Sequence, residues 1–194
     1  MNIRKISSKD AEEKRRKRNG WIIGIILIAV MLFSVLGYSF GSGDENSSTK
    51  INYNGFEFLK QNDFWVLEKD SSYFIFTYNP EQVEKINSNL KPLESYKGKP
   101  LYIFSEDSEA ELEIYRNLFY QNQIMQRFQE ACPEGEKCEG NIPVKTCEDN
   151  FIIIKESEKN EIIQEKNCVF IRGEIENLTK SSDEFLFKIL GIIP

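Results

Sequence analysis

The chain has 194 residues, no histidine, four cysteines and a formal net charge of −6. The lack of histidine excludes the Ser-His-Asp and Cys-His catalytic arrangements and most catalytic zinc sites. Residues 1–20 hold eight of the 25 basic residues and three of the 31 acidic ones, and residues 21–40 hold none, so residues 41–194 carry a net charge of −11. Because an acidic domain repels phosphate groups, the sequence argues against nucleic-acid binding.

Residues 21–40 form a run of twenty uncharged, mainly apolar residues. A helix of this length spans roughly 30 Å, which is the thickness of the hydrocarbon core of a bilayer. We predict an uncleaved transmembrane signal-anchor, because the apolar part of a cleaved signal peptide usually has about 7–15 residues. Cleavage near Gly37-Tyr38-Ser39 is one alternative. A pilin-type signal at Gly20 is another, although residues 21–28 lack the Glu that such signals usually carry.

A basic run directly precedes the predicted span and consists of Lys14, Arg15, Arg16, Lys17 and Arg18. Because basic residues are retained on the cytoplasmic side, we predict a cytoplasmic tail over 1–20 and an extracytoplasmic location for the chain after residue 40. Specific binding of an anionic lipid head group is the alternative use of this run. Residues 41–50 are polar and rich in Gly and Ser, which predicts a flexible linker, and residues 51–194 are enough for one folded domain.

Short runs rich in aromatic and β-branched residues predict strands over 51–59, 64–68, 73–78 and 100–104. Gln-Asn-Asp and Lys-Asp-Ser are turn signals between the first three runs, and a short helix is predicted over 80–86 with Pro80 in its first turn. The aromatic residues of this region are expected to form core, with the lining of a ligand groove as the alternative. They are Phe56, Phe58, Phe64, Trp65, Phe74 and Phe76.

A long helix is predicted over 108–131. Ser108 and Glu111 fit a capping box at its start. An apolar stripe at three- and four-residue steps then predicts a face that packs on a sheet, with partner binding as the alternative. The stripe consists of Leu112, Tyr115, Leu118, Phe119, Met125 and Phe128.

The four cysteines are Cys132, Cys138, Cys147 and Cys168, and no two of them have CxxC spacing. The spacing therefore favours neither a zinc site nor a redox-active pair, and we predict no metal, no cofactor and no catalytic residue. In an extracytoplasmic domain two disulfides are expected. Of the three connectivities we favour Cys132–Cys138 with Cys147–Cys168.

The second of these pairings rests on a predicted hairpin. Residues 151–154 and 161–163 are strand-like on either side of a turn at 157–160. If the turn is centred between Ser157 and Glu158, facing residues have numbers that sum to 315, as 147 and 168 do. A disulfide there would close the open end of the hairpin and add about 3 kcal/mol of stability on the chain-entropy model.

Residues 168–172 predict another strand, and Ser181 with Glu184 fits a capping box for a short helix that ends at Gly191. The run from Cys147 through residues 167–173 to residues 183–191 resembles the C-terminal block of uncharacterised single-span membrane proteins of archaea. This resemblance implies a membrane anchor and a cysteine-stapled α+β domain, and it brings no activity.

These elements together predict an α+β fold: one N-terminal transmembrane helix, then a mostly antiparallel sheet with one long and one short helix packed on it. The layout favours a binding or assembly module that sits in the lipid bilayer of the cytoplasmic membrane and contacts an envelope or membrane protein. One alternative is a carboxylate-dependent enzyme acting on an envelope polymer, recognisable by two carboxylates about 5–10 Å apart in an apolar cleft. A pilin-like subunit is the other. Asn46 and Asn177 begin possible glycosylation sequons.

Overall fold

The computed structural model describes residues 30–31 and 49–194 of the chain. The chain divides into two units, Met1–Ser47 and Ser48–Pro194, and the second holds every strand and helix described below. The described residues do not include the predicted tail (1–20), most of the predicted span or most of the linker. Within residues 30–31 and 49–194, no helix combines the length and apolar character that crossing a bilayer requires.

The first sheet is an antiparallel meander of four strands, in chain order. It confirms the antiparallel prediction for this part of the chain, except that the predicted strand 51–59 is two strands joined by a turn at Asn54 and Gly55. Both turn residues have positive φ, 49° and 85°, as tight hairpin turns require. The strands are β1 (Lys50–Tyr53), β2 (Phe56–Gln61), β3 (Phe64–Lys69) and β4 (Ser72–Phe76).

The second sheet has five strands in the order β10-β11-β9-β5-β6, and only β10 and β11 pair antiparallel. The prediction of a single, mostly antiparallel sheet therefore does not describe this part of the domain. A separate two-stranded parallel ribbon, β7 (Cys132–Pro133) with β8 (Val144–Lys145), follows β6 in the chain. The five strands are β5 (Pro100–Ser105), β6 (Arg127–Glu130), β9 (Phe151–Glu156), β10 (Glu161–Glu165) and β11 (Cys168–Gly173).

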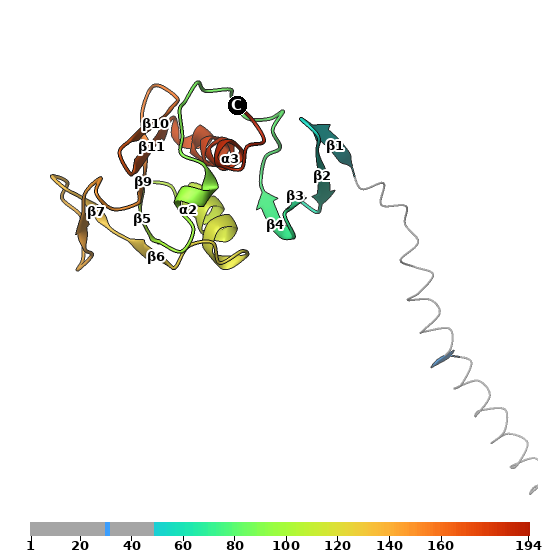
Figure 1. Ribbon diagram of the computed structural model, residues 1–194, viewed down its shortest axis with the longest axis horizontal. Helices are drawn as coiled ribbons and strands as arrows, with labels where there is room; N and C mark the ends of the chain where they lie inside the picture. Colours follow the sequence, from blue (N-terminus) through green and yellow to red (C-terminus); the bar gives the residue numbers. More distant parts are fainter. Residues whose placement is uncertain (1–29, 32–48) are drawn as a thin grey trace, which may run out of the picture. The chain divides into compact units, whose positions relative to one another are not determined.

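Two helices, α2 (Ser108–Tyr115) and α3 (Leu178–Ile189), lie between the two sheets (Figure 1). The Phe187 ring of α3 lies 5.8 Å from the Phe58 ring and 4.5 Å from the Phe76 ring of the first sheet. The other side of α3 packs on β9, β10 and β11. Ten of the twelve residues of α3 are buried, as expected for a helix enclosed on both sides.

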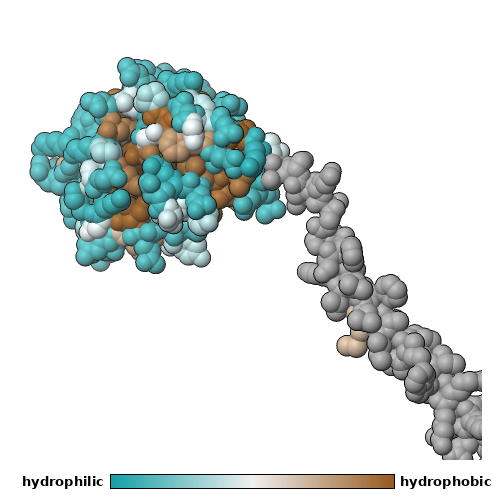
Figure 2. Space-filling view, turned by 45° about the vertical axis from the view of Figure 1, so that its right-hand side comes forward, coloured by the Kyte–Doolittle hydropathy of each residue, from teal (hydrophilic) through white to brown (hydrophobic). Residues whose placement is uncertain are grey.

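One continuous core joins the layers and includes the helix-facing side chains of both sheets. On the side presented in Figure 2, hydrophilic side chains cover most of the domain, and apolar side chains reach the surface between them. Short 3₁₀ turns, η1 (Leu93–Ser95) and η3 (Ile175–Asn177), complete the connections. The fold is therefore α+β, with a helical layer between two sheets.

The long helix predicted over 108–131 is shorter than expected. The α-helix ends at Tyr115 and continues as a π-helical turn, η2 (Arg116–Tyr120). Gln123 then adopts a positive φ of 49°, and residues from Arg127 onward form strand β6. Of the predicted stripe, Leu118 and Met125 are buried in the core, whereas Leu112 is 52% exposed. Phe128 contributes from a strand, because pairing with β5 overrides the helical periodicity.

The two predicted capping boxes are also wrong. Asp107, not Ser108, is the N-cap of α2, and its carboxylate accepts hydrogen bonds from the N–H groups of Glu109 and Ala110. Helix α3 begins one turn before Ser181, with Asn177 as the N-cap, so Glu184 lies in its interior. Residues 80–86 form a turn and loop rather than a helix, and the N–H of Ile86 donates to Glu184 at 2.6 Å.

The outer edge of β4 is closed by side-chain amides instead of another strand. The N–H of Ile75 donates to Asn117 Oδ1 at 2.7 Å, and Asn117 Nδ2 donates back to the Ile75 carbonyl at 2.8 Å. Asn122 Nδ2 donates to the carbonyl of Tyr73 at 2.9 Å. Asn117 of the π-helical turn and Asn122 just after it thereby occupy three of the backbone groups that an exposed edge strand would offer to a second chain.

Candidate functional site

Both predicted disulfides are present, but the hairpin used to predict one of them is not. Cys132 and Cys138 are bonded, as are Cys147 and Cys168. Strand β10 does not pair with β9; β11 lies between them and runs parallel to β9, with Cys168 opposite Phe151. Parallel strands begin at the same end of a sheet. Cys147, which precedes β9, therefore lies beside Cys168, which is the first residue of β11. The connectivity is confirmed, and its structural basis is a parallel pair.

The strand register places the outward-facing residues of the second sheet in three rows on the face opposite the helices. The first row is Tyr102, Phe151, Cys168 and Glu165; the second is Phe104, Ile153, Phe170 and Ile163; the third is Lys155, Arg172 and Glu161. This outer face therefore changes from aromatic to apolar to cationic along the strands.

The ribbon formed by β7 and β8 covers the first row except for the exposed Glu165. Lys145 Nζ of the ribbon lies 4.1 Å from the centre of the Tyr102 ring, and Tyr102, Phe151 and Cys168 are almost fully buried. The second row is more open: Phe104 and Phe170 are half-buried and Ile163 is 38% exposed. The ribbon thus covers the outer face only as far as the first row.

A groove of about 280 Å³ lies where the cover stops. Its floor is made by side chains of β9 and β11 and by the Cys147–Cys168 disulfide, and its walls come mainly from the ribbon segment. Among its charged residues are three cations and two acids, although acids outnumber cations in the domain as a whole. The lining residues are Pro133, Glu134, Glu136, Lys145, Thr146, Cys147, Phe151, Ile153, Lys155, Cys168, Phe170 and Arg172.

Two of the cations, Lys155 and Arg172, lie directly opposite each other on β9 and β11. Like charges in this position repel, and each is balanced by an acid from another element. Lys155 Nζ is 2.6 Å from Glu136 Oε1, and Arg172 Nη1 is 2.7 Å from Glu161 Oε1. Lys155 also lies over the ring of Phe104, and Arg172 over the ring of Phe170. The two cations are held in place on the sheet.

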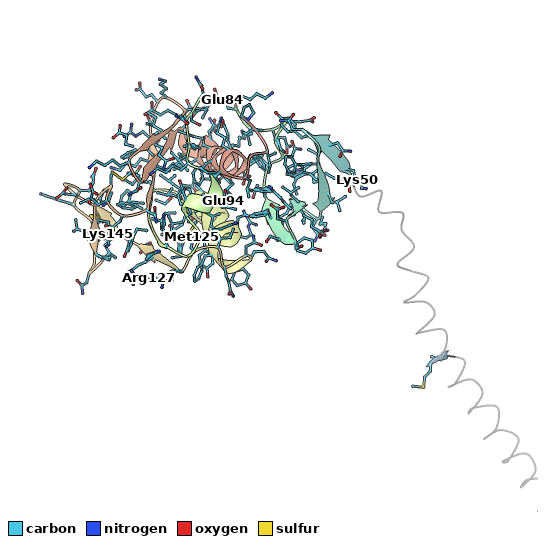
Figure 3. All side chains as sticks on the ribbon, viewed as in Figure 1. Lys50, Glu84, Glu94, Met125, Arg127 and Lys145 are labelled. Atoms are coloured by element: carbon cyan, nitrogen blue, oxygen red, sulfur yellow. A yellow bond between two sulfur atoms is a disulfide. The ribbon has the colours of Figure 1, made fainter. Side chains whose placement is uncertain are left out.

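The third cation, Lys145, belongs to a cluster around the hydroxyl group of Tyr102. Hydrogen bonds to Tyr102 and Asp149 raise the pKa of Lys145 above its usual value, so its charge is retained. Arg127 Nη2 donates to the Tyr102 hydroxyl oxygen at 2.6 Å. The first strand begins at Lys50. In Figure 3, Lys145 and Arg127 lie toward the opposite end of the domain from Lys50.

The only group of buried acids that we identify in residues 49–194 lies elsewhere, between α2 and α3. Glu113 accepts hydrogen bonds from Thr77 and Arg116, and Asp183 accepts one from the N–H of Tyr78 at 2.8 Å. Burial, followed by the neighbouring charge of Glu113, raises the pKa of Asp183 well above its usual range.

This acid pair does not fit the expectation for a carboxylate-dependent enzyme. The test for that hypothesis was a pair of carboxylates in an apolar cleft, where a substrate could reach both. Glu113 is 1% exposed and Asp183 0% exposed, so neither can meet a substrate in this conformation. The pair instead joins α2 to α3 and to the end of β4, and a structural role accounts for it.

Of the other predicted site residues, only Asn177 lies in the described part of the chain. Asn177 occupies the N-cap position of α3 without a capping hydrogen bond from its side chain, and Lys180 Nζ donates to its Oδ1. The sequon residue Thr179 is 7% exposed inside the helix. Attachment of a glycan at Asn177 would therefore have to precede folding. Asn46 and the basic run from Lys14 to Arg18 lie outside the described residues. No group of three or more Cys, Asp or Glu side chains suited to a metal ion is found in the described part of the chain.

The sequence did not lead to this groove: the aromatic residues of the first sheet were expected to form core, and a ligand groove was considered only there, as the alternative. The signal of the groove was present in the strands Phe-Ile-Ile-Ile and Cys-Val-Phe-Ile, which are apolar at consecutive positions, as is typical of parallel strands with both faces buried. Comparisons with known proteins add no identification: the chain matches no family model, no curated protein and no solved structure.

Proposed function

We propose that this protein is a membrane-anchored extracytoplasmic binding module, and that the groove on the outer face of the second sheet is its ligand site. One observation carries the proposal. The strands of this sheet have apolar residues on both faces, whereas helices cover only the inner face and the ribbon covers only part of the outer one. An outer face of this kind is suited to a partner that completes its cover.

The organisation of the chain supports this function. The uncharged run at residues 21–40 and the polar linker would tether the domain to the outer surface of the cytoplasmic membrane, and two disulfides suit an oxidising compartment. The tether would enter at Lys50, at the far end of the domain from Lys145 and the ribbon (Figure 3). A domain held in this way can turn its groove toward a partner in the envelope without interference from its attachment point.

Site-specific photo-crosslinking in native membranes tests the proposal. A photoreactive amino acid at position 163 places the reactive group in the apolar row, where Ile163 is 38% exposed. Position 175 provides the matched control, because Ile175 is similarly exposed, at 45%, but lies in η3 after the sheet. We expect a discrete adduct from position 163 and none from position 175.

The adduct must also depend on the groove. Combining the position-163 probe with Arg172→Gln is expected to reduce the adduct, whereas combining it with Lys166→Gln should leave it unchanged, because Lys166 is an exposed residue outside the groove lining. Equal adducts from positions 163 and 175, or no adduct from either, would show that this face is not a binding surface.

A further inference from the structure

We propose that the groove binds a polypeptide segment in which a carboxylate side chain lies next to an apolar side chain. This inference rests on the function proposed above and specifies the partner of the same site. The carboxylate would meet Lys155 and Arg172, and the apolar side chain would lie on Ile153 and Phe170. The contacts of these four residues support the inference, and they disfavour ligands of other chemical classes.

The charge of the groove selects a carboxylate. Lys155 and Arg172 face outward from adjacent positions of neighbouring strands, so one anion can contact both. Arg172 gives one hydrogen bond to Glu161 and Lys155 gives one to Glu136. A guanidinium group has five N–H donors and an ammonium group three, so both retain donors for a ligand. Their side chains are only 39% and 26% exposed, and this partial burial strengthens the attraction to an anion.

The same surroundings disfavour a multiply charged ligand. Glu134 and Glu136 line the groove, and Glu161 lies beside Arg172. A phosphate group, with up to two charges, would meet these acids in a domain that already carries an excess of negative charge. A single carboxylate can share the two cations with their present partners, whereas a polyanion would have to displace them.

The aromatic side chains of the outer face disfavour stacking against a sugar ring. A cation already lies over three of the four rings: Lys145 and Arg127 over Tyr102, Lys155 over Phe104 and Arg172 over Phe170. The fourth ring, Phe151, is only 1% exposed. What remains accessible is ring edge and aliphatic surface, which suits an apolar side chain. The rim adds both donors and acceptors, from Thr146, Lys145 and Glu134, and a peptide backbone can use both kinds whereas an acyl chain uses neither.

Fluorescence anisotropy with labelled, end-blocked peptides tests this inference on the full chain in lipid nanodiscs. The probes are Leu-Glu-Phe-Glu, Gly-Glu-Ser-Glu and Leu-Lys-Phe-Lys, with empty nanodiscs as the control for binding to lipid. We expect only the acidic and apolar peptide, Leu-Glu-Phe-Glu, to bind. Its Kd should rise about tenfold in Lys155→Gln and in Arg172→Gln, because each removes a charge-assisted hydrogen bond.

Two further variants separate a binding effect from an effect on folding. Ile163→Ser should weaken binding through the apolar row, while Lys166→Gln removes an exposed lysine of the same charge outside the groove and should leave Kd unchanged. Each variant is compared with the unaltered chain by its unfolding temperature, and a variant whose temperature falls by more than a few degrees is replaced by the milder Lys155→Met or Arg172→Met.

The outcomes distinguish this inference from the function on which it rests. Equal binding of Gly-Glu-Ser-Glu, or preferential binding of Leu-Lys-Phe-Lys, overturns the ligand class. A position-163 adduct that survives protease digestion of the partner identifies a carbohydrate or lipid and overturns the inference while the binding function stands. If position 163 gives no specific adduct and no peptide binds, both proposals fail together.

Discussion

The two faces of the five-stranded sheet contrast in how they are covered. On the inner face Ile152, Ile154, Val169 and Ile171 are fully buried against the helices. On the outer face, one residue further along the same strands, the side chains pass from a buried aromatic row to the half-buried Phe104 and Phe170 and then to Lys155 and Arg172. Only the inner face is completed by the described part of the chain.

Stability and recognition therefore depend on alternate residues of the same strands. Because successive side chains of a strand point to opposite faces, a substitution at one position tests the core and at the next tests the groove. Inner-face substitutions should therefore change the free energy of unfolding. Substitutions of the exposed outer-face residues, such as Ile163 and Arg172, should change it little.

The largest effect is expected for Ile154→Ala on the inner face of β9. Ile154 is 0% exposed, and its truncation leaves a cavity among the helices and strands, so the free energy of unfolding should fall by about 3–4 kcal/mol. Ile163→Ala on the outer face, where the side chain is 38% exposed, should cost less than about 1 kcal/mol. Urea denaturation of both variants measures the difference, and equal losses would remove the contrast between the faces.

Loss of the Cys147–Cys168 disulfide should be the next largest effect. Its ends are 21 residues apart, and the chain-entropy model gives a loss of about 3 kcal/mol for the Cys147→Ala/Cys168→Ala double variant. The Cys132–Cys138 disulfide closes a separation of six residues, and its removal should cost about 2 kcal/mol. Thermal unfolding of the two double variants compares them, and a larger loss for the shorter loop would contradict the entropic account.

A dependence of stability on pH is expected from Glu184 in the helical layer. Burial raises the pKa of Glu184 to about 7 in the folded chain, against 4.5 for an unperturbed Glu, despite hydrogen bonding from the Ile86 N–H and the nearby charge of Lys188. The folded state thus binds this proton more tightly than the unfolded state. The stabilisation is complete below pH 4.5 and is lost as the pH rises to about 7, by at most about 3 kcal/mol.

Unfolding of the chain and of Glu184→Gln, measured from pH 4 to pH 8, tests this expectation. Gln keeps an oxygen for the Ile86 N–H but has no proton to lose, so the stability of the variant should vary less over this range. Because the pKa of Asp183 is also raised, both proteins are expected to lose some stability at higher pH through Asp183. Identical pH profiles for the two would show that Glu184 does not carry the effect.

The smallest effect on stability is expected for Arg172→Gln. Its ion pair with Glu161 is partly exposed, on both sides, and such pairs contribute roughly 0–1 kcal/mol. The variant should therefore unfold within about 1 kcal/mol of the unaltered chain, while its Kd for the peptide rises about tenfold. Chemical denaturation and anisotropy on the same preparation measure both properties. A large loss of stability would place Arg172 among the structural residues instead.

The parts of the fold that follow from local sequence were predictable. The turns around Asn62 and Asp70, the strands on either side of them and the strand at 168–172 all depend on neighbouring residues. All are present, although the predicted strand 51–59 is divided into β1 and β2. The helix at 108–131 failed where it depended on distant residues, because pairing with β5 takes residues 127–130 into the sheet. The hairpin at 151–163 failed for the same reason: β11 pairs with both strands and separates them.

The candidate site was predictable only in part. Both disulfides were predicted, although the prediction of Cys147–Cys168 rested on a hairpin that is absent. Cys147–Cys168 lies in the floor of the groove. The cation pair could not be recognised from spacing, because Lys155 and Arg172 become neighbours only through the parallel register of β9 and β11. The consecutive apolar residues of these strands indicated a parallel sheet, but in the hairpin interpretation they were assigned to a single antiparallel one.

The amide closure of β4 by Asn117 and Asn122 has a further consequence for a tethered chain. Membrane attachment would confine many copies to one plane with a common orientation, which raises the frequency of encounters between identical surfaces. An open β4 edge in that setting would allow sheets to join from one molecule to the next and grow into fibres. With the Tyr73 carbonyl and both backbone groups of Ile75 already occupied, copies can crowd together at this edge with less tendency to polymerise.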